Sequence, residues 1–152
     1  MSEDDPIGLL REMAKKNVLV EICLTSNDVI LGVSGDRHPL PVYMKYGVPV
    51  ALATDDEGVS RGDMTHEYLR AVETYGLSYA DLKRMARASL EHSFIPGRSV
   101  WQKSESRVAV CELDLRKPEN PSPPCKALLE NSERAHVQWQ LEKSFAEFEK
   151  KF

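Results

Sequence analysis

Two short apolar segments, residues 18 to 24 and 49 to 54, constrain the fold more than any other feature of this sequence. The first follows a segment with helical periodicity, residues 4 to 16, and a second helical segment, residues 40 to 46, lies between the two. This order predicts βα units, in which the apolar segments are neighbouring strands of a parallel sheet. Both segments carry apolar residues on both faces, apart from Glu21, as is typical of strands that are covered on both sides.

The fold class predicted from this pattern is therefore α/β. Two further helices are predicted, over residues 65 to 75 and residues 78 to 92, because apolar residues recur there at helical spacing between turn signals. Polar loops are predicted for residues 25 to 39 and for residues 57 to 64.

The composition of the chain changes after about residue 97. Residues 1 to 97 form the predicted α/β part, and residues 98 to 131 are predicted to be an irregular linker that contains the proline-rich stretch PENPSPP. Residues 132 to 152 are predicted to form an amphipathic helix that packs on the rest of the chain or on a partner. Its apolar face consists of Val137, Leu141, Phe145, Phe148 and Phe152.

The predicted sheet is incomplete, because only two strands are well defined. Residues 107 to 115, with the sequence RVAVCELDL, are the one other candidate. A sheet of two parallel strands cannot bury its own faces and needs more strands or cover from other elements. We therefore interpret the chain as part of a larger sheet.

Charge and cysteine content exclude several classes of protein. A net charge of −4 over 152 residues argues against a nucleic-acid-binding protein, and no apolar run is long enough to span a membrane. The first residues, MSEDDP, do not resemble a signal peptide. Cys23, Cys111 and Cys125 form no metal-binding motif, so reduced thiols and a cytoplasmic location are expected, with Cys23 buried in its strand.

Asp55 and Asp56 follow the second predicted strand directly. Adjacent carboxylates repel each other and are costly to desolvate, so a chain that places them at the end of a buried strand has a use for them. Ligands and catalytic groups gather at the carboxyl ends of parallel strands, and aspartate is a good zinc ligand. The simpler interpretation is a turn or a helix cap, since aspartate favours both.

The spacing of the four histidines matches no metal-binding motif. His38, His66, His92 and His136 occur neither as H-x-H nor as H-E-x-x-H. Each is therefore interpreted as a surface or packing residue.

Several motifs occur in a fixed order along residues 5 to 97: EICLTSN, HP, GVPVALATDDEGVS, HEYLRAV and ARASLEHSFIPG. Together they resemble the carboxyl-terminal part of the adenosine deaminase family of metal-dependent hydrolases. The resemblance implies a (β/α)8 barrel, in which residues 18 to 24 are the seventh strand and residues 50 to 53 the eighth.

The resemblance also implies a site. Asp55 matches the aspartate ligand of the family's zinc ion, and Asp56 matches the aspartate that hydrogen-bonds the purine ring. The implied reaction is hydrolytic deamination of adenosine or a related aminopurine, with ammonia as the leaving group. Zinc assists such a reaction by lowering the pKa of a water molecule toward 7.

The chain lacks several residues that the family uses for metal binding and catalysis. The resemblance places an H-x-H pair, two further histidines and a catalytic glutamate on earlier strands, and no residue here matches them. The chain alone is therefore expected to be inactive and to need the amino-terminal portion of the barrel as a partner. Glu57 and Leu24 stand where many members have proline, which leaves the substrate open.

Two alternatives remain from the sequence. The chain could be a non-catalytic subunit or remnant that acts through protein–protein contacts, for which the apolar tail helix offers a surface. An acidic pair at a strand end also occurs in phosphorylation-controlled α/β modules that hold magnesium, but those modules need further strands that this sequence lacks.

Overall fold

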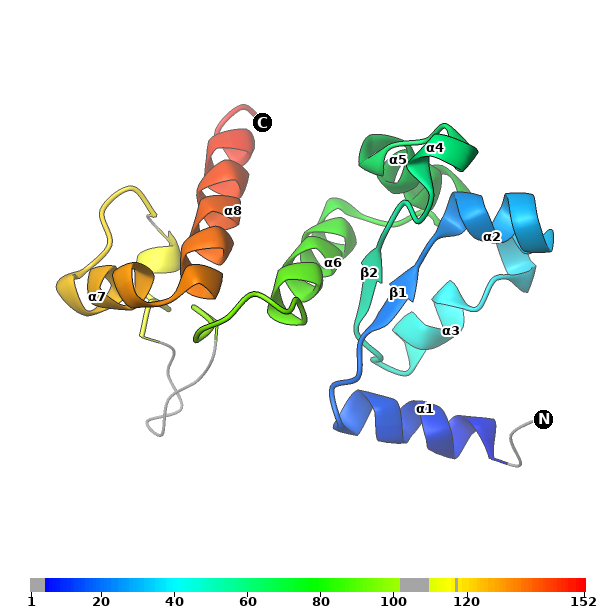
Figure 1. Cartoon of the computed structure of the whole chain (residues 1–152), viewed down its shortest axis with the longest axis horizontal. Coiled ribbons are helices and arrows are strands. Elements are labelled where there is room, and N and C mark those ends of the chain that lie inside the picture. The colour runs from blue at the N-terminus through cyan, green and yellow to red at the C-terminus, as the bar shows by residue number, and fades with distance from the viewer. Residues whose placement is uncertain (1–4, 102–109, 117) are drawn as a thin grey trace. The chain divides into compact units, whose positions relative to one another are not determined.

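The computed structural model describes residues 5–101, 110–116 and 118–152. The chain divides into two compact units, unit 1 over Met1–Ser89 and unit 2 over Leu90–Phe152. Figure 1 shows the helices and strands of each unit. None of the helices in the described residues is long and apolar enough to cross a bilayer.

Unit 1 is built around two short parallel strands, β1 (Val20–Ile22) and β2 (Val50–Leu52). They pair in register, with Val20 opposite Val50 and Ile22 opposite Leu52, and lie side by side among the helices of the unit (Figure 1). Within the described residues these two strands are the whole sheet. The predicted α/β fold with a small parallel sheet is confirmed, and both strands lie inside the predicted ranges.

The helices of unit 1 alternate with these strands. They are α1 (Pro6–Lys15), α2 (Leu24–Leu31), α3 (Leu40–Lys45), α4 (Glu57–Ser60), α5 (Met64–Tyr75) and α6 (Tyr79–Glu91), and a 3-10 turn covers Gly35–Arg37. α6 ends just inside unit 2. The core of unit 1 consists of buried residues from the strands and from α2, α3, α5 and α6, namely Ile22, Leu24, Leu40, Val50, Leu52, Ala71 and Met85.

Helix α2 corrects the loop predicted for residues 25 to 39. The helix begins directly after β1 and ends at Gly32, which adopts a left-handed φ of 63°. No helical periodicity is visible here because α2 has no apolar stripe: Val29, Ile30 and Leu31 are adjacent, and each is 65–67% exposed. The loop predicted for residues 57 to 64 likewise contains the one-turn helix α4.

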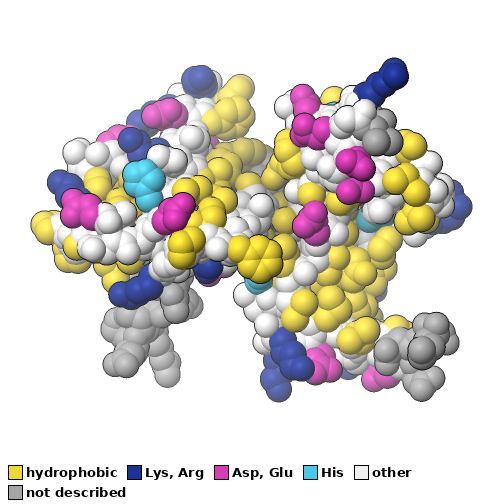
Figure 2. All heavy atoms as spheres, viewed as in Figure 1, with side chains coloured by type: hydrophobic (Ala, Val, Ile, Leu, Met, Phe, Trp, Pro, Cys, Tyr) yellow, Lys and Arg dark blue, Asp and Glu magenta, His cyan; other side chains and the backbone are white. Residues whose placement is uncertain are grey.

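Hydrophobic side chains stay exposed on one face of unit 1. Figure 2, in the same view as Figure 1, shows hydrophobic side chains gathered over the part of unit 1 that carries α3. In β1, Val20 is only partly buried and Glu21 is exposed. The sheet is thus not fully covered by the described residues, as expected for part of a larger sheet.

Unit 2 contains α7 (Pro123–Asn131), α8 (Glu133–Glu149) and a 3-10 turn at Asp114–Arg116. The irregular linker predicted for residues 98 to 131 therefore includes a helix, and Pro123 and Pro124 occupy its first turn, where a missing N–H costs nothing. Of the strand candidate at residues 107 to 115, residues 107 to 109 lie outside the described residues. The rest is turn and 3-10 structure.

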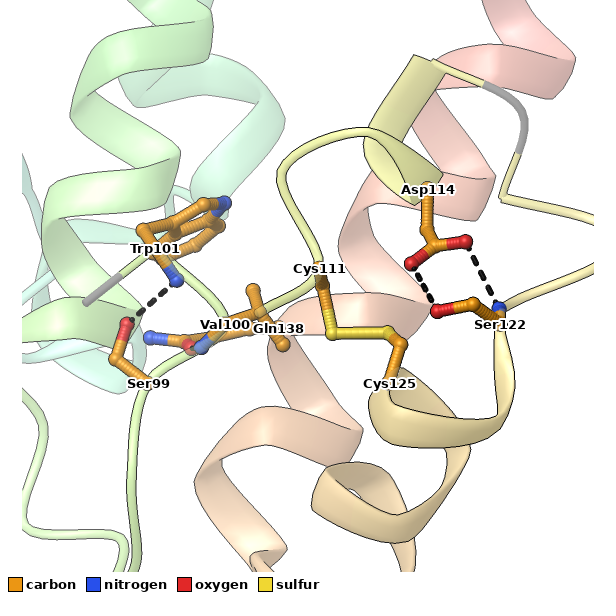
Figure 3. The surroundings of a disulfide bond; sticks show 8 residues. All are labelled: Ser99, Val100, Trp101, Cys111, Asp114, Ser122, Cys125 and Gln138. Carbon is orange, nitrogen blue, oxygen red and sulfur yellow. Dashed lines mark hydrogen bonds between the residues drawn. A yellow bond between two sulfur atoms is a disulfide. The ribbon is translucent and has the colours of Figure 1, made fainter. Parts of the chain in front are cut away.

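A disulfide bond joins Cys111 to Cys125 in unit 2 (Figure 3). The expectation of reduced thiols is therefore wrong for these two cysteines. A separation of 14 residues forms no recognisable motif, so the sequence did not reveal the pairing. Cys23 is the free cysteine, and it is half-buried rather than buried.

The buried face of α8 differs from the predicted apolar stripe. Ala135, Gln138, Trp139 and Glu142 are buried, whereas Phe148 is 45% exposed and Phe152, beyond the helix, is 94% exposed. Polar side chains thus occupy part of the face of α8 that packs against the core of unit 2. The helix itself lies within the range predicted for it.

Candidate functional site

The aspartate pair lies where the main chain turns out of β2. Ala53 still donates its N–H to the Ile22 carbonyl at 2.9 Å, so the pairing of the strands ends two residues before Asp55. Asp55 adopts a left-handed φ of 56°, which aspartate tolerates better than most residues. This sharp turn leaves both carboxylates exposed at the carboxyl end of the strand.

Asp56 is the N-cap residue of α4, but its side chain makes no capping hydrogen bond to that helix. The interpretation of the pair as a helix cap is therefore correct for the position of Asp56 in the chain and not for its side chain.

The carboxylate of Asp55 is held from the neighbouring strand. Ser26 Oγ donates a hydrogen bond of 2.7 Å to Asp55 Oδ2. Ser26 is buried in the first turn of α2, directly after β1. The contact joins residues that follow the two strands, and its charged acceptor makes it stronger than a neutral hydrogen bond.

Ser26 belongs to a run of four residues that each contact a different part of unit 1. Thr25 donates its backbone N–H to Glu67, Asn27 contacts His38, and Asp28 pairs with Arg70. The run fixes the first turn of α2 against α5 and against the end of β2.

Glu67 of α5 anchors this arrangement. Its side chain is 1% exposed, and its Oε1 accepts the Thr25 N–H at 3.2 Å. A carboxylate at the first turn of a helix is stabilised by the unpaired N–H groups there. Arg70, one turn further along α5, donates to Thr25 Oγ1 at 3.5 Å, and its hydrogen bond to Asp28 holds the pKa of that carboxyl below its ordinary value.

His38 is a structural residue, as its pattern predicted. Its Nδ1 accepts the Leu40 N–H at 3.1 Å, which assigns the ring proton to Nε2 and makes Nε2 the donor to Asn27 Oδ1 at 2.9 Å. Burial lowers the pKa of His38, and the nearby Arg70 charge lowers it further. Both ring nitrogens are therefore engaged in holding the loop before α3.

Cys23 lies between β1 and α2, beside this network. Burial raises the pKa of its thiol, and the negative charges of Glu21, Asp55 and Glu67 raise it further. A thiol in such surroundings stays protonated, and a protonated thiol is a poor nucleophile and a poor metal ligand.

A shallow, open polar depression lies on the surface formed by α4, by the loop after it and by the start of α5. The residues that line it are Glu57, Gly58, Arg61, Gly62, Asp63 and His66.

The described residues do not form a metal site by themselves. No group of three or more histidine, cysteine, aspartate or glutamate side chains in that part of the chain is placed to share one ion. Asp55 offers a single carboxylate, and zinc sites need three or four protein ligands. Asp55 as metal ligand and Asp56 as purine ligand stay predictions.

Glu67 and Arg70 are the supporting residues that sequence reasoning missed. Both lie in the segment HEYLRAV, which was noted only as a motif. A glutamate followed three residues later by an arginine on one helix resembles an ordinary surface pair. Only the tertiary structure reveals that both side chains point to the first turn of α2.

The model of the adenosine deaminase family matches residues 1–107. The adenosine deaminase of Aliivibrio fischeri is 37% identical over 93 residues, which are 60% of this chain and 28% of that protein. An aminodeoxyfutalosine deaminase from Streptomyces coelicolor is 34% identical over 101 residues, which are 64% of this chain and 26% of that protein. The N6-methyl-AMP deaminase of Danio rerio is 35% identical over 90 residues, which are 59% of this chain and 26% of that protein.

Solved structures match the same part of the chain. The ADAL–IMP complex has a TM-score of 0.54 at 32% identity and covers 63% of this chain and 28% of its own. The adenine deaminase of Arthrobacter aurescens has a TM-score of 0.55 at 22% identity, over 60% of this chain and 28% of its own. The chain thus spans little more than a quarter of the relatives it matches.

Proposed function

We propose that this chain, which belongs to the adenosine deaminase family, supplies the last two βα units of a deaminase barrel and its aspartate pair. β1 and β2 are the seventh and eighth strands in this proposal, followed by α2 and by α4 and α5. The parallel register of the two strands and the folds of the matching structures support it.

The length of the match agrees with this assignment. Two of the eight strands of a (β/α)8 barrel are a quarter of its units, and the chain spans 28% of the Aliivibrio fischeri enzyme. The side of β1 that the described residues leave partly uncovered, with Val20 and Glu21, is then a surface that the remaining strands of the barrel cover. That amino-terminal portion is the partner that completes the fold, on the same polypeptide or on a separate one.

The proposed activity is hydrolytic deamination of an aminopurine nucleoside such as adenosine. The relatives named above share deamination and differ in substrate, so the class of reaction is better supported than the individual substrate. The elements that would contact a ribose or a phosphate are not assigned in this chain.

Each residue of the pair has a proposed role. Asp55 contributes one carboxylate ligand to a zinc ion whose histidine ligands come from the amino-terminal portion of the barrel. When bound, such an ion would lower the pKa of a water molecule, so that this water could attack the purine at neutral pH. Asp56 accepts a hydrogen bond from the purine and so orients the ring.

The single observation that carries the proposal is the hydrogen bond from Ser26 to Asp55. It fixes a carboxylate at the carboxyl ends of two adjacent parallel strands, where barrel enzymes place their active sites. A carboxylate in a simple surface turn has no need of a buried donor from the next strand.

A chimaera tests this function. Residues 5 to 97 replace the matching segment of the Aliivibrio fischeri adenosine deaminase, and release of ammonia from adenosine is measured. We expect a folded and active chimaera. We expect Asp55→Ala to remove activity and Glu73→Ala, at an exposed carboxylate of α5, to keep it. A chimaera that does not fold, or an Asp55→Ala variant with full activity, contradicts the proposal.

A non-catalytic binding role is the second candidate. The exposed run Val29, Ile30 and Leu31 favours it, because three adjacent aliphatic side chains at 65–67% exposure are typical of a contact surface. Sedimentation of the purified chain separates the two candidates. A stable complex of defined size favours the binding role, whereas a loosely folded monomer favours the barrel portion.

A further inference from the structure

The disulfide of unit 2 lies at the centre of its hydrophobic core. Cys111 and Cys125 are both fully buried, and they pack with Val100, Ala135 and Trp139. Cys125 is on α7, whereas Cys111 precedes the 3-10 turn at Asp114–Arg116 (Figure 3). The bond therefore fastens the turn segment and α7 to each other inside the core.

The same core receives a non-helical segment, Ser99–Trp101, which we term the strap. Val100 donates its N–H to Gln138 Oε1 at 2.9 Å, and Trp101 Nε1 donates to Glu142 Oε1 at 3.1 Å. Gln138 and Glu142 are both buried on α8. The strap is thus held by polar contacts that exist only while α8 packs on this core.

Apart from the disulfide, the core of unit 2 is small. Among the described residues, three besides the two cysteines form its buried apolar cluster, and Trp101, Leu115, Leu128 and Leu129 pack on it half-buried. A single core in a domain of this size rarely supplies more than modest stability, so a cross-link contributes a large share of the stability. The loop between the cysteines also carries the proline-rich stretch, in which Pro118 is buried and Pro123 and Pro124 are exposed.

We propose that the redox state of Cys111 and Cys125 decides whether unit 2 is folded and the strap is held. A dithiol reductant attacks one sulfur, the S–S bond breaks, and a mixed disulfide forms. The second thiol of the reductant then displaces the protein sulfur. Two electrons and two protons pass to the cysteines, and the reductant becomes a cyclic disulfide. Two unlinked thiols then remain where the cross-link held α7.

The chain carries separate reporters for its two units. Both tryptophans, Trp101 and Trp139, lie in unit 2. All five tyrosines, Tyr43, Tyr46, Tyr68, Tyr75 and Tyr79, lie in unit 1. Tryptophan emission therefore reports on unit 2, and the ring-proton NMR signals of the tyrosines report on unit 1.

The test is a titration of the full chain with dithiothreitol. Two of the three cysteines form the disulfide, so one free thiol is expected before reduction and three are expected afterwards. We expect tryptophan emission to shift to the red and the Val100 amide to lose its protection from hydrogen exchange. The folding equilibrium constant of unit 2 should fall roughly a hundredfold, while the tyrosine signal stays unchanged.

Variants control this test. Cys23→Ser should respond to dithiothreitol as the unchanged chain does, because Cys23 is outside the bridge. The double variant Cys111→Ala, Cys125→Ala should resemble the reduced chain without any reductant. The proposal is overturned if the reduced chain or the double variant keeps the blue-shifted emission and the protected Val100 amide. It is also overturned if the oxidised chain shows three free thiols.

Discussion

Ser26 and Asp55 form the contact on which the geometry of the candidate site depends. If the hydrogen bond between them is the main interaction of both side chains, Ser26→Ala and Asp55→Ala should not destabilise unit 1 additively. We expect a coupling free energy of about 1 kcal/mol in a double-mutant cycle, since the acceptor is charged and also exposed. Urea unfolding followed by the tyrosine signal measures it, and additive effects would argue against the contact.

Glu67 gives a second prediction at this scale. Glu67→Ala leaves the buried N–H of Thr25 without an acceptor and should lower the free energy of unfolding by about 1–3 kcal/mol. Glu67→Gln keeps an acceptor oxygen and should lower it less. Glu73→Ala, at an exposed position of the same helix, is the matched control and should have little effect. Equal losses for Glu67→Ala and Glu73→Ala contradict the anchoring role.

His38 makes the stability of unit 1 depend on pH. Its pKa in the folded chain is below the ordinary value of 6.5, mainly because of burial, so the unfolded chain binds a proton more readily. The stabilisation from neutral His38 is therefore complete above about pH 6.5 and is lost as the pH falls through the lower folded-state pKa.

Unfolding by urea at a series of pH values should show this loss. We expect His38→Gln to flatten the decrease on the acid side, and His66→Gln, at an exposed histidine, to leave it unchanged. Parallel pH profiles for the unchanged chain and for His38→Gln would exclude His38 as the cause.

At this scale, the positions of the candidate residues were predictable from the sequence, whereas the residues that contact them were not. The place of the aspartate pair follows from the apolar strand before it, and the structural role of His38 follows from the absence of a metal-binding pattern. The donor to Asp55 is 29 residues away along the chain. No local pattern encodes such a distance, because it depends on how two strands align.

At the scale of elements, the strands and the helices with an apolar stripe were predictable, and α2 was not. α2 is stabilised by Glu67 at its first turn and by Gly32 at its end, rather than by an apolar face. The same holds for α8, where the residues that pack are partly polar. Gln138 and Glu142 are buried because the strap needs hydrogen-bond partners.

Gln138 provides the prediction for this element. Gln138→Leu leaves the Val100 N–H and the Glu91 carboxylate without the amide that bonds to both. We expect a loss of about 1–3 kcal/mol in the stability of unit 2, read from tryptophan emission. Gln140→Ala, on the exposed side of α8, should leave the transition in place. A Gln138→Leu variant as stable as the Gln140→Ala variant contradicts the polar anchoring of the strap.

At the scale of the whole molecule, the incompleteness of the sheet was the most informative property of the sequence. Two strands that cannot bury their own faces predict part of a larger sheet, and the family resemblance implies that this sheet is a barrel. The described residues contain the two parallel strands and no others. The disulfide core of unit 2 could not be predicted, because neither the cysteine spacing nor the linker composition signals packing.

The most direct test of the proposed site is the zinc content of the chimaera that carries residues 5 to 97. We expect one zinc ion per chain, since Asp55 then completes a ligand set from the amino-terminal portion. Asp55→Ala should bind zinc at least about tenfold more weakly, and Glu73→Ala should bind it as the unchanged chimaera does. Zinc affinity that is unaltered in a folded Asp55→Ala chimaera would contradict the assignment of Asp55 to the metal.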